Sequence, residues 1–278
     1  MPTLYSHSRL SSFETCKKKF YFRYVQGLPQ RTEGIEAFVG KRVHEVLERL
    51  YRFVEEERIP SLPKVQKRYY ALFDEHYDPT RVKIVKQGMD VSHYRDLGAQ
   101  CIENHYRRHY PFDEGETLGI EQRVVFDLDE AGQYEIQGVI DRIVRTRDGV
   151  IEIQDYKTGS YVPSQKKLDT DRQLALYQIG VARQLETDAP IRLVWHYLAR
   201  GRTCTSTRTP EQLEALQRET IELIDRIQAE THFPAQKNNL CPWCEYKDVC
   251  PAFGHTPPPA EPQAGGDSAE KPGQLSLL

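Results

Sequence analysis

Two carboxylates and a lysine lie close together in the middle of the chain, in a pattern that suits phosphate chemistry. Asp141 belongs to the first of two apolar-rich segments within residues 138–159, and Asp155 and Lys157 belong to the second. Both segments are rich in Val and Ile, and the Asp-Gly pair between them is typical of a hairpin turn. Because side chains alternate along a strand, Asp155 and Lys157 are predicted to share one face.

A divalent cation is the partner that suits two neighbouring carboxylates, since buried charges need compensation. Such a cation polarises a phosphate, generates hydroxide from bound water and neutralises the leaving oxygen. A nearby lysine can orient the attacking water or offset the developing charge. An Asp-x-Lys triplet occurs by chance in many chains, whereas a second Asp on the paired strand makes the pattern more specific. These residues therefore predict metal-dependent hydrolysis of phosphodiesters.

Cysteines form a second group with ligand spacing. Cys241, Cys244 and Cys250 give C-x2-C-x5-C, which needs a fourth ligand. Cys16 is the favoured fourth, because its N-terminal helix has little else to fix it, while Cys101 and Cys204 are most simply free core cysteines. The spacing leaves an iron–sulfur cluster and zinc open as alternatives, with disulfides less favoured in an intracellular chain.

Hydrophobic periodicity predicts the elements that position these residues. His44 falls on a predicted helix, where a lone His is more often structural than a ligand. Glu121 opens a predicted strand and could be a surface charge or a site residue. Gln173 and Tyr177 lie one turn apart on one helix face. The predicted helices are 4–28, 37–58, 62–112 (an insertion with breaks), 170–185 and 210–230, and the predicted strands are 120–128, 134–145, 150–156, 191–198 and 202–208.

Composition limits the class of protein. The 278 residues suffice for one α/β domain, predicted over residues 1–253, and the net charge of -3 does not by itself indicate a nucleic-acid partner. The chain has no long apolar run and no signal-peptide core, so we expect a cytoplasmic protein without membrane contact. Residues 254–278 are rich in Pro, Ala and Gly, which predicts a disordered tail.

The order of these motifs resembles a known nuclease family. His44, then Gly-Val-Ile-Asp141, then Asp155-x-Lys157, then Gln173-x3-Tyr177 resembles the RecB-like branch of the PD-(D/E)XK nuclease superfamily. With the cysteines added, the chain is similar to the iron–sulfur nucleases of that branch. These include the CRISPR-associated RecB-like nucleases, AddB-type nuclease domains and eukaryotic exonuclease V. The resemblance extends over about residues 8–251.

The resemblance implies a restriction-endonuclease-like fold, with a central mixed sheet flanked by helices, an N-terminal helical region and a C-terminal iron–sulfur segment. It implies Mg²⁺ or Mn²⁺ at His44, Asp141, Asp155 and the backbone carbonyl of Tyr156. Lys157 would be the catalytic lysine, and Gln173 and Tyr177 would position the DNA backbone. Glu121 matches an acidic position of many relatives without an assigned role. The ligands of a 4Fe-4S cluster would be Cys16, Cys241, Cys244 and Cys250.

The activity implied is exonucleolytic cleavage of single-stranded or frayed DNA ends in repair, recombination or CRISPR adaptation. No helicase motif accompanies these residues, so a helicase or a CRISPR adaptation protein is an expected partner. The terminal pentapeptide resembles the motif by which bacterial repair proteins bind the sliding clamp, and it consists of Gln274, Leu275, Ser276, Leu277 and Leu278. We therefore expect association with the nucleoid. The competing interpretations are a non-catalytic DNA-binding scaffold, an RNA or defence nuclease, and a zinc protein.

Overall fold

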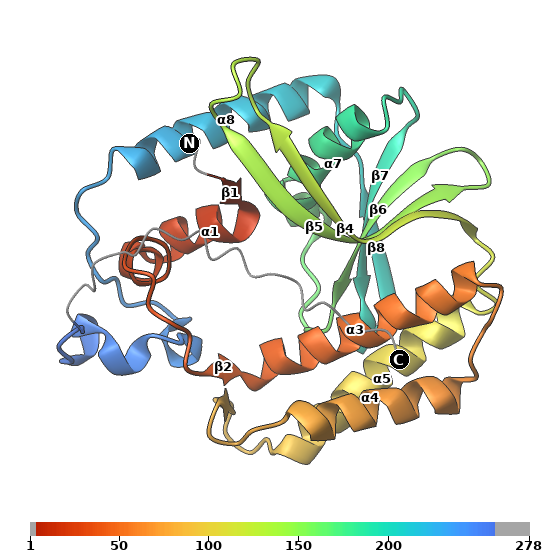
Figure 1. Ribbon diagram of the computed structural model, residues 1–278, viewed down its shortest axis with the longest axis horizontal. Coiled ribbons are helices and arrows are strands. Elements are labelled where there is room, and N and C mark those ends of the chain that lie inside the picture. Colours follow the sequence, from red (N-terminus) through yellow and green to blue (C-terminus); the bar gives the residue numbers. More distant parts are fainter. Residues whose placement is uncertain (1–3, 259–278) are drawn as a thin grey trace.

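The computed structural model describes residues 4–258, and its centre is a mixed six-stranded sheet (Figure 1). The strand order is β1-β5-β6-β7-β8, and β4 also pairs with β5. The strands are β1 (Tyr5–Ser6), β4 (Gly115–Asp127), β5 (Glu135–Thr146), β6 (Ile151–Lys157), β7 (Ile191–Tyr197) and β8 (Arg202–Ser206). The terminal pentapeptide, for which sliding-clamp binding was expected, and most of the predicted tail lie outside the described residues.

The sheet combines antiparallel and parallel pairs, as the family resemblance implied. β5 pairs antiparallel with β4 and β6, β6 pairs parallel with β7, and β7 pairs antiparallel with β8. The parallel β6–β7 pair requires a crossover connection, which the helices α6 (Gln165–Leu168) and α7 (Arg172–Gln184) provide. This mixed α/β architecture is the predicted fold class.

The β5–β6 hairpin forms where the sequence predicted it. Its turn is closed by hydrogen bonds from the Gly149 amide to the Thr146 carbonyl and from the Thr146 amide to the Val150 carbonyl, both 2.9 Å. Gly149 has φ +82°, a left-handed conformation that glycine adopts without steric cost. The hairpin brings the two acidic strands of the predicted site side by side.

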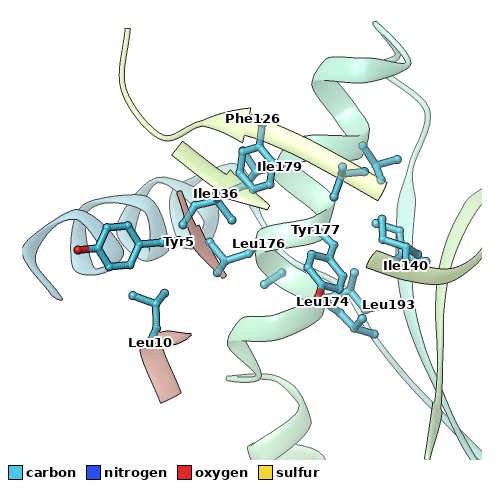
Figure 2. Packing of buried hydrophobic residues seen from close by; sticks show 14 of the residues in the cluster. Tyr5, Leu10, Phe126, Ile136, Ile140, Leu174, Leu176, Tyr177, Ile179 and Leu193 are labelled. Atoms are coloured by element: carbon cyan, nitrogen blue, oxygen red, sulfur yellow. The ribbon is translucent and has the colours of Figure 1, made fainter. Parts of the chain in front are cut away.

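Helices cover both faces of the sheet (Figure 1). The long helices are α1 (His7–Thr15), α3 (Ile35–Glu55), α4 (Leu62–His76), α5 (Val91–His109) and α8 (Pro210–Gln228). One hydrophobic cluster packs α1, α7 and α8 on one face, where Leu174 and Tyr177 lie near Ile140 and Leu193 (Figure 2). A second cluster joins α3, α4 and α5 to Ile120, Tyr156 and Leu198 on the other.

Short elements complete the described chain. They are α2 (Lys17–Phe20), η1 (Tyr21–Val25), β2 (Glu33–Gly34), β3 (Val82–Lys83), η2 (Leu198–Arg200), η3 (Cys241–Trp243), η4 (Lys247–Val249) and η5 (Pro251–Phe253). Among residues 4–258, no helix combines the length and the apolar character needed to cross a bilayer.

The prediction of one continuous helix over residues 4–28 was wrong. The chain breaks at Cys16, whose backbone is extended with φ -163° and ψ 110°, and it continues as α2 and the π-helical turn η1. The break allows Phe13 and Phe20 to meet edge to face, with ring centroids 5.3 Å apart in the core. Tertiary packing therefore overrides the local helical pattern here, and it leaves Cys16 at a corner of the chain.

Candidate active site

The two neighbouring strands β5 and β6 supply the acidic side chains. The Tyr156 amide donates a hydrogen bond to Asp141 Oδ2 at 2.6 Å, which fixes the Asp141 carboxylate against β6. Asp155 is only 6 % exposed, and its Oδ2 lies 2.8 Å from Lys157 Nζ. The strand alternation holds as predicted, because Tyr156 packs in the opposite hydrophobic cluster from Ile151 and Ile153.

Helix α3 brings His44 to these strands. His44 Nε2 lies 2.9 Å from the Tyr156 carbonyl oxygen, and Nδ1 lies 3.2 Å from Asp141 Oδ1. Burial disfavours the charged imidazolium, but the carboxylates of Asp141, Asp155 and Glu121 together outweigh burial and raise the pKa of His44 to about 9. The His44 ring thus contacts two other groups expected to share one metal ion with it, Asp141 and the Tyr156 carbonyl.

Glu121 joins the same group from β4. Its neighbours Ile120 and Gln122 pair with Arg142 and Ile140, so Glu121 stands opposite Asp141 across the strand pair. One ligand atom from each of His44, Glu121 and Asp141 lies within 4.8 Å of the others.

Glu121 also has a strained backbone, with φ +47° in a non-glycine residue. Backbone strain of this kind is concentrated at functional sites. Burial, and next the Asp141 charge, raises the pKa of Glu121 to about 7. The sequence named Glu121 only as a candidate, and its signal there was no more than an acidic residue at the start of a strand.

Lys157 connects the acidic strand to helix α7. Its Nζ donates to Asp155 Oδ1 at 3.0 Å and to Gln173 Oε1 at 3.2 Å. Tyr177 lies one turn after Gln173 on α7 and is largely buried against Gly138. Gln173 therefore positions the lysine, while the Tyr177 ring belongs to the core and leaves little surface for a ligand.

The charges of this site favour a divalent cation. Burial raises the pKa of Asp155 to about 6, an effect that the Lys157 ammonium opposes and the Asp141 carboxylate reinforces. A cation would relieve the repulsion between these carboxylates, and carboxylate and carbonyl oxygens are the ligands that Mg²⁺ and Mn²⁺ prefer. The donor set of Glu121, Asp141, Asp155, the Tyr156 carbonyl and the His44 imidazole therefore fits such an ion.

The four cysteines singled out in the sequence line one cavity of about 70 Å³, and they are Cys16, Cys241, Cys244 and Cys250. The C-terminal segment that carries three of them lies beside the N-terminal helices (Figure 1), where Asn238 Nδ2 donates to the Thr15 carbonyl at 3.0 Å. Tyr246 Oη donates to the Leu28 carbonyl at 2.9 Å. Cys101 and Cys204 are buried elsewhere as free thiols, as predicted.

Comparison with known proteins gives the family. The model of the PD-(D/E)XK nuclease superfamily matches residues 4–251. The chain belongs to this superfamily, whose members hydrolyse nucleic acids with divalent metal ions. The matching description names the superfamily and no branch within it. No match was found among the curated proteins.

Two solved structures are similar to the chain. A protein from Eubacterium rectale, named provisionally as an exonuclease, is 11% identical with a TM-score of 0.49, over 93% of this chain and 90% of its own. The protein SSO0001 is 15% identical with a TM-score of 0.34, over 88% of this chain and 95% of its own. TM-scores this low support no inference about substrate or partners.

Proposed function

We propose that this nuclease is a DNA exonuclease that acts on single-stranded or frayed ends with Mg²⁺ or Mn²⁺. The observation that supports the proposal most is the convergence of His44, Glu121 and Asp141 within 4.8 Å, beside the Asp155–Lys157 ion pair. A decayed, purely DNA-binding member would have no reason to retain an acidic cluster with its lysine. We therefore favour the enzyme over the scaffold.

Each residue of the site has a distinct part in this proposal. The cation is held by His44, Glu121, Asp141, Asp155 and the backbone carbonyl of Tyr156. When bound, the cation supplies a Lewis acid for the phosphate and lowers the pKa of a water molecule.

Lys157 remains the catalytic lysine of the proposal. Asp155 and Gln173 both contact its ammonium and hold it beside the acidic cluster. Burial opposes the charge of Lys157, but Asp155 outweighs burial and raises its pKa, so the side chain stays an ammonium that can stabilise negative charge on the reacting phosphate.

Cleavage of labelled DNA by matched variants tests the activity. We expect Asp155→Ala and Lys157→Ala to lose cleavage with both Mg²⁺ and Mn²⁺. Lys67→Ala, an exposed lysine on α4 far from the site in sequence, serves as the control and should retain it. If the two site variants degrade DNA as fast as the wild type, the assignment of these residues is wrong.

A substrate panel tests the finer claims. Linear single-stranded DNA, circular single-stranded DNA, blunt duplex and RNA of the same sequence should be compared. An exonuclease for DNA ends should cleave the linear strand, spare the circle and act weakly on RNA. Rapid cleavage of the circle would contradict the exonuclease, and preferential cleavage of RNA would support the RNA or defence nuclease instead.

We further propose that the cysteine cavity holds a 4Fe-4S cluster, which would place the protein in the RecB-like iron–sulfur branch. The support is that three clustered cysteines and one distant cysteine line the same cavity. Protein purified without oxygen should be brown and contain iron and sulfide. Cys16→Ser should abolish the colour, whereas the core variant Cys204→Ser should keep it. A colourless zinc-loaded protein would contradict the cluster.

The proposed partners follow from the terminal pentapeptide and from the lack of helicase motifs beside the nuclease residues. A nuclease without helicase motifs needs ends that another protein has opened, as in repair, recombination or CRISPR adaptation. For the terminal pentapeptide, residues 274–278, we propose binding to the bacterial sliding clamp and hence location at the nucleoid. Clamp pull-down with the full chain and with a chain lacking these five residues tests this, and equal binding would contradict it.

A further inference from the structure

Three histidines meet inside the protein, separated from the cluster of His44 and Asp141 by Tyr156. His105 and His109 lie one turn apart on α5, and His196 lies on β7. Their exposed fractions are 2 %, 7 % and 3 %. The ring centroids are separated by 4.3 Å (His105–His109), 5.4 Å (His105–His196) and 5.0 Å (His109–His196). One ring nitrogen from each lies within 4.8 Å of the others.

One nitrogen of each ring already has a hydrogen-bond partner. His109 Nδ1 donates to Glu114 Oε2 at 2.8 Å, because a carboxylate can only accept at this contact. His196 Nδ1 lies 3.1 Å from Thr203 Oγ1, and His105 Nε2 lies 2.8 Å from Tyr51 Oη. Hydroxyl oxygens can accept from these rings in the same way. Each ring can therefore carry its proton on the partnered nitrogen.

The other nitrogen of each ring is buried without a hydrogen-bond partner among residues 4–258, and these atoms are His105 Nδ1, His109 Nε2 and His196 Nε2. In the tautomers that the partners favour, all three carry a lone pair and no proton. Three acceptors cannot satisfy one another, and burying a polar atom without a partner is unfavourable. Ordinary core packing therefore leaves this cluster unexplained.

We propose that His105, His109 and His196 bind a structural Zn²⁺ ion through these three nitrogens. Metal-bound histidines typically donate their other ring N–H to a carboxylate or another acceptor, and that arrangement is present here three times. Three imidazoles favour zinc over Mg²⁺ or Ca²⁺, which prefer oxygen ligands. A water molecule can complete a tetrahedral site.

The charges around the cluster select against weakly bound cations, while its burial keeps the rings available as ligands. Burial lowers the pKa of His105 and of His196 well below their ordinary value, which keeps both rings neutral and able to bind a metal. Arg142 and Arg108 face the cluster and oppose a cation, while the Glu114 carboxylate offsets them. Only an ion bound tightly by nitrogen ligands is expected to be retained here.

The position of the ion gives it a structural role. Zinc would fasten α5 to β7, where His196 pairs in register with Tyr156 of β6. The Tyr156 ring lies 5.1 Å from the His105 ring and 5.6 Å from the His196 ring, and its carbonyl contacts His44. Zinc would thus support the active-site strand from the face opposite to Asp155. This inference stands independently of the proposed DNA substrate.

Sequence reasoning missed this cluster. The spacing His105-x3-His109 places two rings on one helix face, which is a usable signal. His196 is distant in the sequence and becomes a neighbour only through the packing of α5 on the sheet.

Crystals of the wild-type full chain grown with zinc chloride provide the decisive test. Anomalous difference maps from data collected on both sides of the zinc absorption edge should show a peak among the three histidines, with Zn–N distances of about 2.0–2.1 Å. Zinc at the cysteines or at His44 without a peak among these histidines would overturn the proposal. This measurement needs no variant and is unaffected by folding defects.

Variants give the same answer in solution. His109→Gln and His196→Gln should each contain one zinc per chain less than the wild type after gel filtration. His93→Gln, an exposed histidine on the same helix, should contain as much as the wild type. Zinc chloride should raise the Tm of the wild type and of His93→Gln more than that of the two site variants. Equal zinc contents in all four proteins would overturn the proposal.

Discussion

Replacing Gly138 by alanine should disturb both the core and the active site. Gly138 lies on β5, three residues before Asp141, and the ring of Tyr177 packs directly on it. A β-carbon at this position would lie 2.1 Å from Cε1, 2.7 Å from Cζ and 2.9 Å from Cδ1 of Tyr177. Since carbon atoms in contact are about 3.5–4.0 Å apart, the ring or the strand must move by more than about 1 Å.

The expected loss of stability follows from two opposing effects. Overpacking a core costs about 1–3 kcal/mol, whereas exchanging Gly for Ala recovers about 0.4–1 kcal/mol through the unfolded chain. The net loss is roughly 1–2 kcal/mol. For a chain of this size we expect the Tm to fall by about 2–8 °C.

The same change should lower kcat, because a displaced Tyr177 would shift α7, on which Gln173 accepts from Lys157. Differential scanning calorimetry and DNA cleavage measure the two effects. Gly159→Ala is the matched control, since a β-carbon there has no atom within 4 Å. The double variant Gly138→Ala, Tyr177→Leu should lose less stability than the two single changes together. An unchanged Tm for Gly138→Ala would refute the packing described here.

Three further predictions concern the metal ligands and the C-terminal segment. Burial opposes the charge on His44 but its acidic neighbour raises the pKa to about 9, so Mn²⁺ must displace a proton. Affinity should therefore rise from about pH 7 to about pH 9 with proton release, measured by calorimetry in two buffers, and a pH-independent affinity would contradict this. Glu121→Gln should weaken Mn²⁺ binding yet preserve or raise the Tm without metal, because it removes a repelled carboxylate. Glu116→Gln, an exposed substitution on the same strand, is the control and should leave the Mn²⁺ affinity unchanged. Equal Mn²⁺ affinities for the two variants would argue against Glu121 as a ligand. Tyr246→Phe removes a buried hydrogen bond between the C-terminal segment and the N-terminal region, at a cost of about 1 kcal/mol. Its Tm should fall by roughly 2–4 °C, and an unchanged Tm would mean that this contact does not hold the segment.

The sequence predicted the parts of the fold that depend on local pattern. The β5–β6 hairpin follows from Val and Ile alternation around an Asp-Gly turn, so the positions of Asp155 and Lys157 could be predicted with it. Helix α3 also follows from its apolar stripe, predicted over residues 37–58 and observed as Ile35–Glu55. In both elements the buried and exposed faces are encoded by residues close together in the sequence, so the pattern can be recognised without knowing the rest of the fold.

Features that depend on distant partners could not be predicted in the same way. The left-handed backbone of Glu121, within the strand that pairs with β5, is invisible in residue types. The break at Cys16 exists because Phe13 and Phe20 meet in a core that residues far along the chain complete. The cavity that Cys16 shares with the other three cysteines likewise forms only after the ends of the described chain come together.

Tyr156 explains how these distant parts act together. Its amide donates to Asp141, its carbonyl contacts His44, and its ring packs against His105 and His196. One residue thus sets the relative position of two proposed metal ligands and supplies a third. A shift of β6 would misplace these three ligands at once. The Asp155–Lys157 ion pair lies within β6 and would move with the strand. Loosening α5 should therefore reduce metal affinity before it affects the environment of Lys157. The packing of His105 and His196 on the Tyr156 ring is thus as important to the site as its acidic residues.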